Sequence, residues 1–140
     1  MATTNLNALS VDSLTVNGDD VGHMPLPILS KSGDYTVTPE DSGSVIIVTG
    51  ADKVMTLPAT VAGLKYTFVL AAAGLSVGTG LQISPAAADK IMGNGFTSAD
   101  DKDAILAGSG DREGDSITII GDGSLGWYIV GVVGTWTRQG

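Results

Sequence analysis

The chain of 140 residues contains no cysteine and a single histidine, and aromatic residues make up only 5% of it. The absence of cysteine excludes a disulfide framework, a thiolate nucleophile and a cysteine-based zinc site. Because aromatics are few, the apolar residues are mostly Ala, Val, Leu and Ile, each of which buries a modest area. We therefore expect one domain with a thin core.

Charge is also scarce, and most of it has one sign. Charged residues make up 16% of the chain, against about a quarter in an ordinary soluble domain. Fifteen acidic and seven basic residues give a net charge of -8, so neutralisation of phosphates by Lys and Arg cannot drive binding and no nucleic-acid partner is expected. Since 43% of the residues are hydrophobic, we expect something other than water to cover part of the surface.

No hydrophobic run is long enough to cross a bilayer. The most apolar stretch, residues 66–75, has about half of the length that a membrane span needs. The first residues contain neither a basic region nor an apolar one, which predicts that the chain has no signal peptide and is synthesised in a cytoplasm. We expect no membrane partner.

The chain is predicted to have two parts with a boundary near residue 30. Residues 1–30 hold isolated apolar residues in polar surroundings, typical of an arm, and Pro25 and Pro27 favour extended geometry and predict a stiff connector. Residues 31–140 are predicted to form the β domain.

A small hairpin is predicted within the arm. Asn17 and Gly18 suit the two central positions of a type I′ turn, which both need positive φ. Residues 13–16 can therefore pair with residues 21–24.

From residue 35 onward, short β-rich runs alternate with turn residues. They recur at roughly the 8–12-residue spacing of sandwiches and barrels, which predicts an all-β fold, an antiparallel β-sandwich or jelly-roll-like domain. The predicted strands are residues 35–38, 44–48, 53–57, 65–71, 81–84, 90–92, 116–120, 127–133 and 135–137. Nearly continuous apolar residues at 45–48 and 117–120 predict burial on both faces, whereas alternation at 53–57 predicts one face in water.

Turn residues support the same interpretation. Residues 38–43 have a helix-start pattern that a glycine ends at once, which predicts a single 3-10 turn. Residues 122–124 predict a hairpin loop. Residues 85–88 and 98–106 fit either short helical turns or a long loop. No period of 20 to 50 residues recurs, which excludes solenoids and propellers.

The residues that usually carry chemistry are poorly placed here. His23 lies in the predicted connector, and a lone imidazole with no nucleophile near it is a poor general base. Gly74, Gly78 and Gly80 lack the strand, helix and lysine context of phosphate-binding loops, so we interpret them as a strand connection. No enzymatic activity, catalytic residue or cofactor is predicted.

Two acidic clusters, residues 100–103 and 111–115, offer hard oxygen ligands for calcium, but neither has the spacing of an EF-hand loop. We interpret both as solvated loops and expect no metal. Paired carboxylates for glycoside chemistry remain open, although few aromatics are present to stack a sugar ring. Trp127, Tyr128 and Trp136 fall in apolar strands, where core packing is expected.

The order of strands and turns is itself informative. A Tyr-Thr-Val-Thr strand leads into a Glu-Asp-Ser-Gly turn and an apolar strand, and an alternating strand then ends at Leu57-Pro58. A Gly-Leu-Lys-Tyr-Thr-Phe strand follows, and later a Gly-Asp-Ser-Ile-Thr-Ile-Ile strand precedes a Gly-Trp-Tyr-Ile-Val strand. Over residues 32–137 this pattern resembles small capsid decoration (cement) proteins of tailed bacteriophages. The earlier Ser-Leu-Thr-Val-Asn-Gly-Asp-Asp segment resembles the N-terminal attachment segments of phage fibre and decoration proteins.

The resemblance implies a viral structural protein, a homotrimer on the outside of the phage head that binds the major capsid protein where capsomers meet and stabilises those junctions. Its location would be the virion, on the capsid exterior. The composition agrees in one respect, because a β protein with little charge is expected to hide surface against copies of itself while acidic residues keep it soluble.

We expect the arm to carry the capsid contact. Its apolar residues have no partner within a hairpin, so they can add to an exposed edge or groove. These residues are Leu6, Leu9, Val11, Leu14 and Val16. The alternative is that they begin the subunit's own sandwich.

Two other functions remain open. A trimeric tail-fibre or tailspike module that binds a host receptor or glycan would use the same β architecture. It would expose an aromatic or polar pocket at a loop tip, containing Phe96, Trp127 or Trp136. A tail-associated depolymerase is the third hypothesis.

Overall fold

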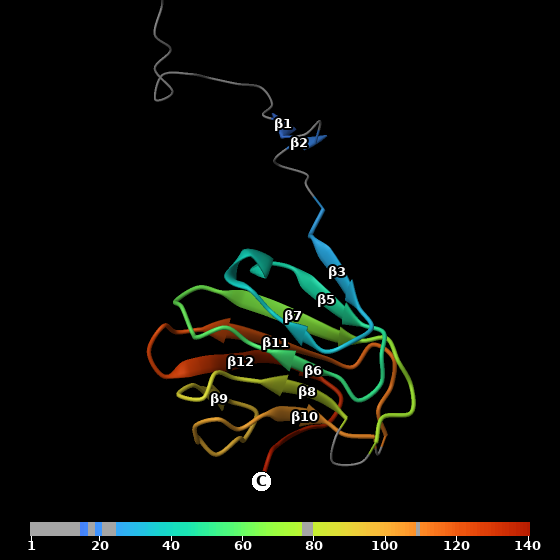
Figure 1. Ribbon diagram of the computed structural model, residues 1–140, viewed down its shortest axis with the longest axis vertical. Coiled ribbons are helices and arrows are strands. Elements are labelled where there is room, and N and C mark those ends of the chain that lie inside the picture. Colours follow the sequence, from blue (N-terminus) through green and yellow to red (C-terminus); the bar gives the residue numbers. More distant parts are fainter. Residues whose placement is uncertain (1–14, 17–18, 21–24, 77–79, 109) are drawn as a thin grey trace, which may run out of the picture.

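The computed structural model describes residues 15–16, 19–20, 25–76, 80–108 and 110–140. Over these residues the chain forms thirteen strands and one turn of 3-10 helix. Two large sheets face each other across a single core (Figure 1). The all-β, sandwich-like architecture predicted from the sequence is confirmed.

The first large sheet has six strands in the order β3-β5-β7-β11-β12-β9. They are β3 (Ile28–Lys31), β5 (Val45–Val48), β7 (Lys65–Leu70), β11 (Ser116–Gly121), β12 (Gly126–Val133) and β9 (Lys90–Met92). The second sheet has five strands in the order β13-β10-β8-β6-β4. They are β13 (Trp136–Arg138), β10 (Ala104–Leu106), β8 (Leu81–Ser84), β6 (Val54–Thr56) and β4 (Tyr35–Thr36).

The connectivity differs from the antiparallel jelly roll that was expected. From β3 to β8 the chain alternates between the sheets, so strands two apart in sequence become neighbours, and the pairs β3-β5, β5-β7, β4-β6 and β6-β8 are all parallel. Each passage from one sheet to the other reverses the direction of the chain. Two passages restore it, so strands two apart in sequence run in the same direction. Antiparallel pairing holds for β7-β11, β11-β12, β8-β10 and β10-β13. Alternating apolar residues are compatible with both patterns, so they could not reveal the parallel pairs.

A separate two-stranded ladder lies in the predicted arm. β1 (Thr15–Val16) pairs antiparallel with β2 (Asp19–Asp20), with Val16 opposite Asp19. A hairpin is confirmed here, but the partner of Thr15–Val16 is Asp19–Asp20, so the expected pairing of these two residues with residues 21–24 is wrong. Residues 21–24 lie outside the described residues.

The predicted connector is wrong at its C-terminal end, because Ile28–Lys31 forms an edge strand of the six-stranded sheet. The carbonyl of Pro27 accepts a hydrogen bond of 2.9 Å from the Val45 N–H. A proline beside an edge strand is tolerated because no neighbour on the outer side needs its missing N–H. The boundary expected near residue 30 therefore falls inside β3.

The loops agree with several predictions. A 3-10 turn, η3 (Pro39–Asp41), follows Thr38, whose N–H donates to the Asp41 carboxylate at 2.9 Å. Residues 122–124 form the loop between β11 and β12, with the Asp122 N–H donating to the Gly126 carbonyl at 3.0 Å. Within residues 98–106, where the sequence left helical turns or a loop open, the chain forms β10.

Alternate residues of each strand enter the core. In β5 and β11 the inward residues are buried while the outward ones are half-buried, so the predicted burial on both faces is wrong. Their outward β-branched residues shield one another along the sheet instead of being covered by a second layer. In β6, Met55 is buried and Thr56 is exposed, which confirms the predicted water-facing side.

Aromatic residues occupy the centre of the core. Trp127 is fully buried, and its ring lies 5.5 Å from that of Tyr66. The Tyr66 hydroxyl donates to the Thr38 carbonyl at 2.9 Å, and burial, followed by the nearby Asp41 carboxylate, raises the pKa of Tyr66 to about 12. Trp136 is also buried, as predicted. Tyr128 is not, because it alternates with Trp127 along β12 and therefore faces outward.

Asp103, at the start of β10, yields a prediction about pH. Burial raises the pKa of its carboxyl above the usual value, although a hydrogen bond with Ser84 opposes the shift. The ionised carboxylate is therefore less stable in the folded chain than in the unfolded one, and stability falls as pH rises from the ordinary pKa through the folded pKa. We expect Asp103→Asn to raise the melting temperature at pH 7.

The matched control for this change is Glu113→Gln, which removes one negative charge from an exposed position. Thermal unfolding at pH 7 and in acid compares the two variants with the parent chain. The advantage of Asp103→Asn should shrink in acid, where the parent carboxyl is already protonated. A lower melting temperature for Asp103→Asn at pH 7 would mean that its contact with Ser84 outweighs the burial of charge.

Candidate interaction surface

The acidic clusters are structural features of loops. The Lys90 ammonium pairs with the Asp100 carboxylate at 2.7 Å, and the buried Asp115 carboxylate accepts the Arg112 N–H at 2.8 Å. Across the residues that the structure describes, no three His, Asp or Glu side chains come together where they could hold a metal ion. In the same part of the chain, no helix is long and apolar enough to cross a membrane.

Two of the glycines that were compared with a phosphate-binding loop have structural roles, one in close packing and one in a backbone conformation that favours glycine. A side chain at Gly80 would overlap the carbonyl of Leu106 on the neighbouring strand, and Gly74 has a φ of +75°. This supports the interpretation of the segment as a strand connection. Gly78 and His23 lie outside the described residues.

One continuous surface with little charge is the outer face of the six-stranded sheet. The register aligns outward residues in rows that cross five strands. One row is Ile28, Val45, Thr67, Thr118 and Gly131; the next is Ser30, Ile47, Val69, Ser116 and Val133; a shorter third is Lys65, Ile120 and Tyr128. Of the outward residues on these five strands, only Lys65 is charged, and on the sixth strand, β9, Lys90 lies on the same side beside Gly126. We call these three rows the outer sheet face.

Two polar side chains on the outer sheet face are paired with each other. The hydroxyls of Thr67 and Thr118 lie 3.0 Å apart on adjacent strands, so one of them donates a hydrogen bond to the other. The remaining residues are mostly β-branched and apolar. A face of this kind loses little hydrogen bonding when a partner covers it, because few of its groups need water.

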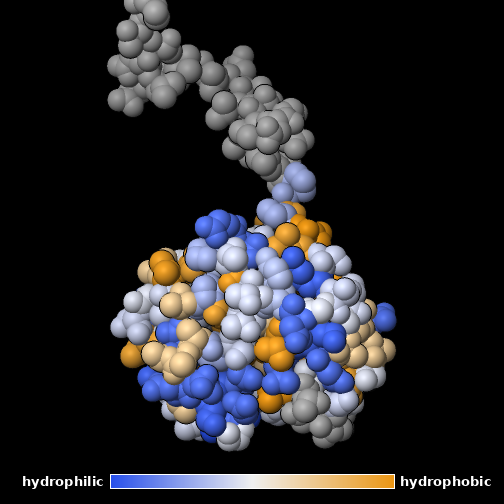
Figure 2. All heavy atoms as spheres, viewed as in Figure 1, coloured by the Kyte–Doolittle hydropathy of each residue, from blue (hydrophilic) through white to orange (hydrophobic). Residues whose placement is uncertain are grey.

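Apolar exposure is greatest where β3 begins. Leu26 and Ile28 are strongly exposed, and a shallow hollow of about 190 Å³ opens beside Leu26, Val45 and Thr67. Figure 2 shows apolar side chains gathered at this end of the sandwich. The predicted N-terminal arm joins the sandwich at the same place, so arm and hollow can form one contact region.

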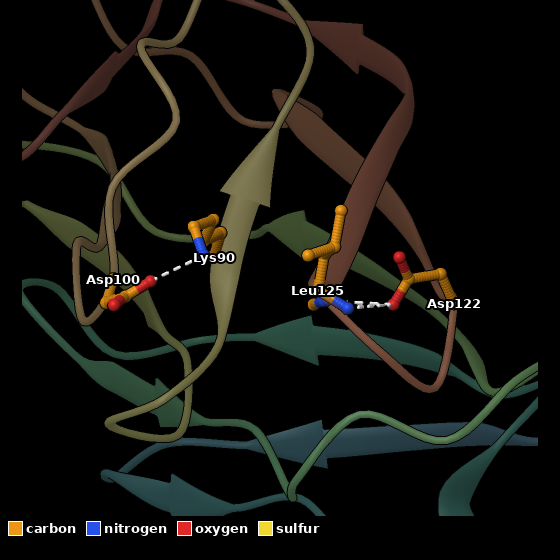
Figure 3. Close-up of polar contacts among 5 residues, drawn as sticks. Lys90, Asp100, Asp122 and Leu125 are labelled. Carbon is orange, nitrogen blue, oxygen red and sulfur yellow. Dashed lines mark hydrogen bonds and ion pairs between the residues drawn. The ribbon is translucent and has the colours of Figure 1, made fainter.

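At the opposite edge, β9 and the β11–β12 loop cover only the first part of β12. Asp122 accepts backbone N–H groups from Ser124 at 2.8 Å and from Leu125 and Gly126 at 2.9 Å. These bonds lower the pKa of the Asp122 carboxyl and fix the loop. Figure 3 shows Asp122 with Leu125 on one side of β9, and on the other the ion pair of Lys90 with Asp100.

The predicted capsid-contact residues cannot be placed together. Leu6, Leu9, Val11 and Leu14 lie outside the described residues, and Val16 belongs to the β1-β2 ladder. Their role stays a prediction. The outer sheet face was not predicted from the sequence. Its signal was the continuous apolar runs at 45–48 and 117–120, which were interpreted as strands buried on both faces.

The aromatic residues named for a glycan pocket do not form an open one. Trp127 and Trp136 are buried in the core, and Phe96 is half-buried and packs against it. The hollow beside β3 contains no aromatic side chain. A sugar-stacking platform would need an exposed ring, so these three residues give the glycan hypothesis no support.

Comparison with known proteins finds no relative: no protein family, curated protein or solved structure matches this chain.

Proposed function

We propose that this chain is a viral structural protein, a capsid decoration protein that binds the outer surface of a tailed-phage head as a homotrimer and stabilises the junctions between capsomers. The observation that carries the proposal is the outer sheet face, which is nearly free of charge and ends in the exposed Leu26 and Ile28 where the arm joins. The chain has a net charge of -8, yet only one charged residue lies on the outer sheet face, which suits this face to permanent contact with protein.

The proposed mechanism is mechanical. The arm and the apolar end of the sandwich contact the major capsid protein, and trimeric attachment brings three such contacts to one junction. Linked weak contacts raise the effective affinity by roughly a hundredfold or more without any single strong site. Buried apolar contact across a capsomer junction then resists its separation.

Removal of residues 1–24 tests the proposed role of the arm. We expect the truncated chain to keep the sandwich, because β3 to β13 and their shared core lie after the deletion. Binding to phage heads that lack the protein should fall by roughly a hundredfold, since the deletion removes all three arms of a trimer. Circular dichroism reports folding, and cosedimentation with the heads reports binding.

A matched control replaces Leu6 and Leu9 by serine in the full-length chain, which keeps the length of the arm and removes apolar surface. This variant should fold normally and bind heads more weakly than the parent chain. If the truncated chain fails to fold, the arm belongs to the subunit's own sandwich. If it folds and binds heads at full strength, the arm is not the capsid contact.

A further inference from the structure

The second half of β12 is an open strand edge. β9 pairs only with Gly126–Tyr128, and it leaves the sheet at Gly93, beside the Ile129 carbonyl. Among the described residues no strand pairs with residues 130–133 on that side. We call residues 130–133 the free edge. Val130 is 59% exposed and Val133 57% exposed, so their side chains are open to a partner, whereas the Val133 carbonyl accepts the Trp136 indole N–H at 3.1 Å.

The free edge lacks most of the usual protection against pairing. Natural edge strands carry charged residues or proline, contain a β-bulge, or are covered by a loop. The free edge reads Val-Gly-Val-Val, with neither charge nor proline. The β11–β12 register shifts at Val130, so the bulge lies at the first residue of the free edge, and residues 131–133 pair regularly with β11 beyond it. An unprotected apolar edge is a template for another strand.

At the opposite edge of the same sheet, no strand within the described part of the chain pairs with the outer side of β3. β3 is a four-residue strand, Ile28–Lys31, the same length as the free edge. The one charged side chain of β3 does not extend from the open edge, because the Lys31 ammonium lies 3.7 Å from the centre of the Tyr35 ring on β4. Ile28 is strongly exposed beside this edge.

We propose that the free edge of β12 pairs with β3 of a second copy of this chain, joining the six-stranded sheets of neighbouring subunits head to tail. This inference rests on the proposed homotrimer and names its interface. A contact between two different edges closes into a ring when the rotation from one copy to the next closes, and a threefold rotation gives the ring of a trimer. Because each copy is acidic, contact between copies is least opposed by repulsion where the surface carries almost no charge.

Strand directions agree with this arrangement. β3, β5 and β7 are mutually parallel, β11 is antiparallel to β7, and β12 is antiparallel to β11. β12 therefore runs in the same direction as β3. Rotation about an axis along the strands preserves direction, so β12 and the β3 of the next copy would form a parallel pair.

The side chains at the two edges are complementary in size. If the rows of the outer sheet face continue across the junction, Ile28 of one copy lies beside Gly131 of the next. Gly131 has no side chain to oppose it. Ser30 then lies beside Val133, so the junction contains no charged pair.

Val130→Lys tests the interface in the full-length chain. We expect the variant to be folded and to elute as a monomer at concentrations where the parent chain is a trimer, with association weakened by roughly a hundredfold or more, because a charge would be buried without a partner. The matched control is Val61→Lys, at a valine that is 53% exposed and lies outside every strand. This control should remain a trimer. Light scattering after size exclusion measures the masses, and a trimeric Val130→Lys variant would overturn the inference.

Cysteine cross-linking provides a second test because the chain has no cysteine of its own. Within one subunit, Ser30 and Val133 stand at opposite edges of five strands, about 19 Å apart at ordinary strand spacing, too far for a disulfide. Oxidation of Ser30→Cys/Val133→Cys, or of Ile28→Cys/Val133→Cys in the adjacent register, should yield covalent trimers. Each single variant should yield none.

The outcomes separate this inference from the proposed function. Covalent dimers of Val133→Cys alone would show that β12 pairs with β12 and would overturn the inference. A trimeric parent chain that forms no cross-link in either register would also overturn it, while leaving the proposed homotrimer standing. A monomeric parent chain would overturn both the inference and the homotrimer. Head binding by the parent chain, measured by cosedimentation, tests the decoration role independently.

Discussion

Trp127→Ala should lower the free energy of unfolding by about 3–5 kcal/mol, the usual cost of removing a large buried aromatic side chain. Trp127 is fully buried, and its ring packs 5.5 Å from that of Tyr66 on β7. The neighbouring Tyr66 ring is held by the hydrogen bond from its hydroxyl to the Thr38 carbonyl at 2.9 Å, which opposes its movement into the cavity. Since a domain of this size is stable by about 5–15 kcal/mol in total, urea unfolding should show a markedly earlier transition.

Two variants make this result interpretable. Tyr128→Ala changes the adjacent aromatic residue, which is 42% exposed, and should cost no more than about 1 kcal/mol. Trp127→Phe should cost less than Trp127→Ala, because the Trp127 Nε1 has no hydrogen-bond partner to lose and a phenyl ring fills part of the space. Equal losses for Trp127→Ala and Tyr128→Ala would contradict the placement of Trp127 at the centre of the core.

Gly126→Ala should also be strongly destabilising, by about 2–4 kcal/mol from backbone strain and overpacking together. Gly126 has a φ of +142°, which residues with a side chain rarely adopt, and its missing Cβ would overlap the Lys90 carbonyl. Lys90 begins β9, so the substitution should displace the three-residue strand that covers the first part of β12. Hydrogen exchange at Lys90–Met92 and urea unfolding would measure the effect.

Gly131→Ala is the control on the same strand. Its Cβ would meet only Thr118, at an ordinary 4.0 Å, and its backbone does not need positive φ. Stability should therefore change by less than about 1 kcal/mol. A loss as large as that of Gly126→Ala would mean that glycine is needed throughout β12, and the close approach to β9 would not explain the result.

Local patterns predicted most strands but not their arrangement. Residues 81–84 and 90–92 were predicted with the bounds that the structure has, since each run has a buried and an outward side. The parallel pairs could not be predicted, because a strand looks the same whether its neighbour comes from a hairpin or from a crossing between sheets. β10 was not predicted as a strand. It has only three residues, all buried, and it follows aspartates at 100, 101 and 103, which are more typical of a loop.

The interaction surface was harder to predict than the core. Ile47, Val69 and Ile120 are as apolar as core residues, and only the structure shows that they face outward. The length of β12 was predicted nearly correctly, but its exposure depends on where β9 ends, which is a tertiary property. Low charge and high hydrophobicity predicted that something other than water covers part of the surface. The outer sheet face is the part of the structure that fits this expectation.

Cryo-electron microscopy of purified phage particles that contain this chain tests the proposed decoration role most directly. The account predicts three joined β-sandwiches on the outside of the head at junctions between capsomers, with the residues that precede β3 directed toward the shell. Density for this sandwich on tail fibres or tailspikes, or its absence from the head surface, would contradict the proposal.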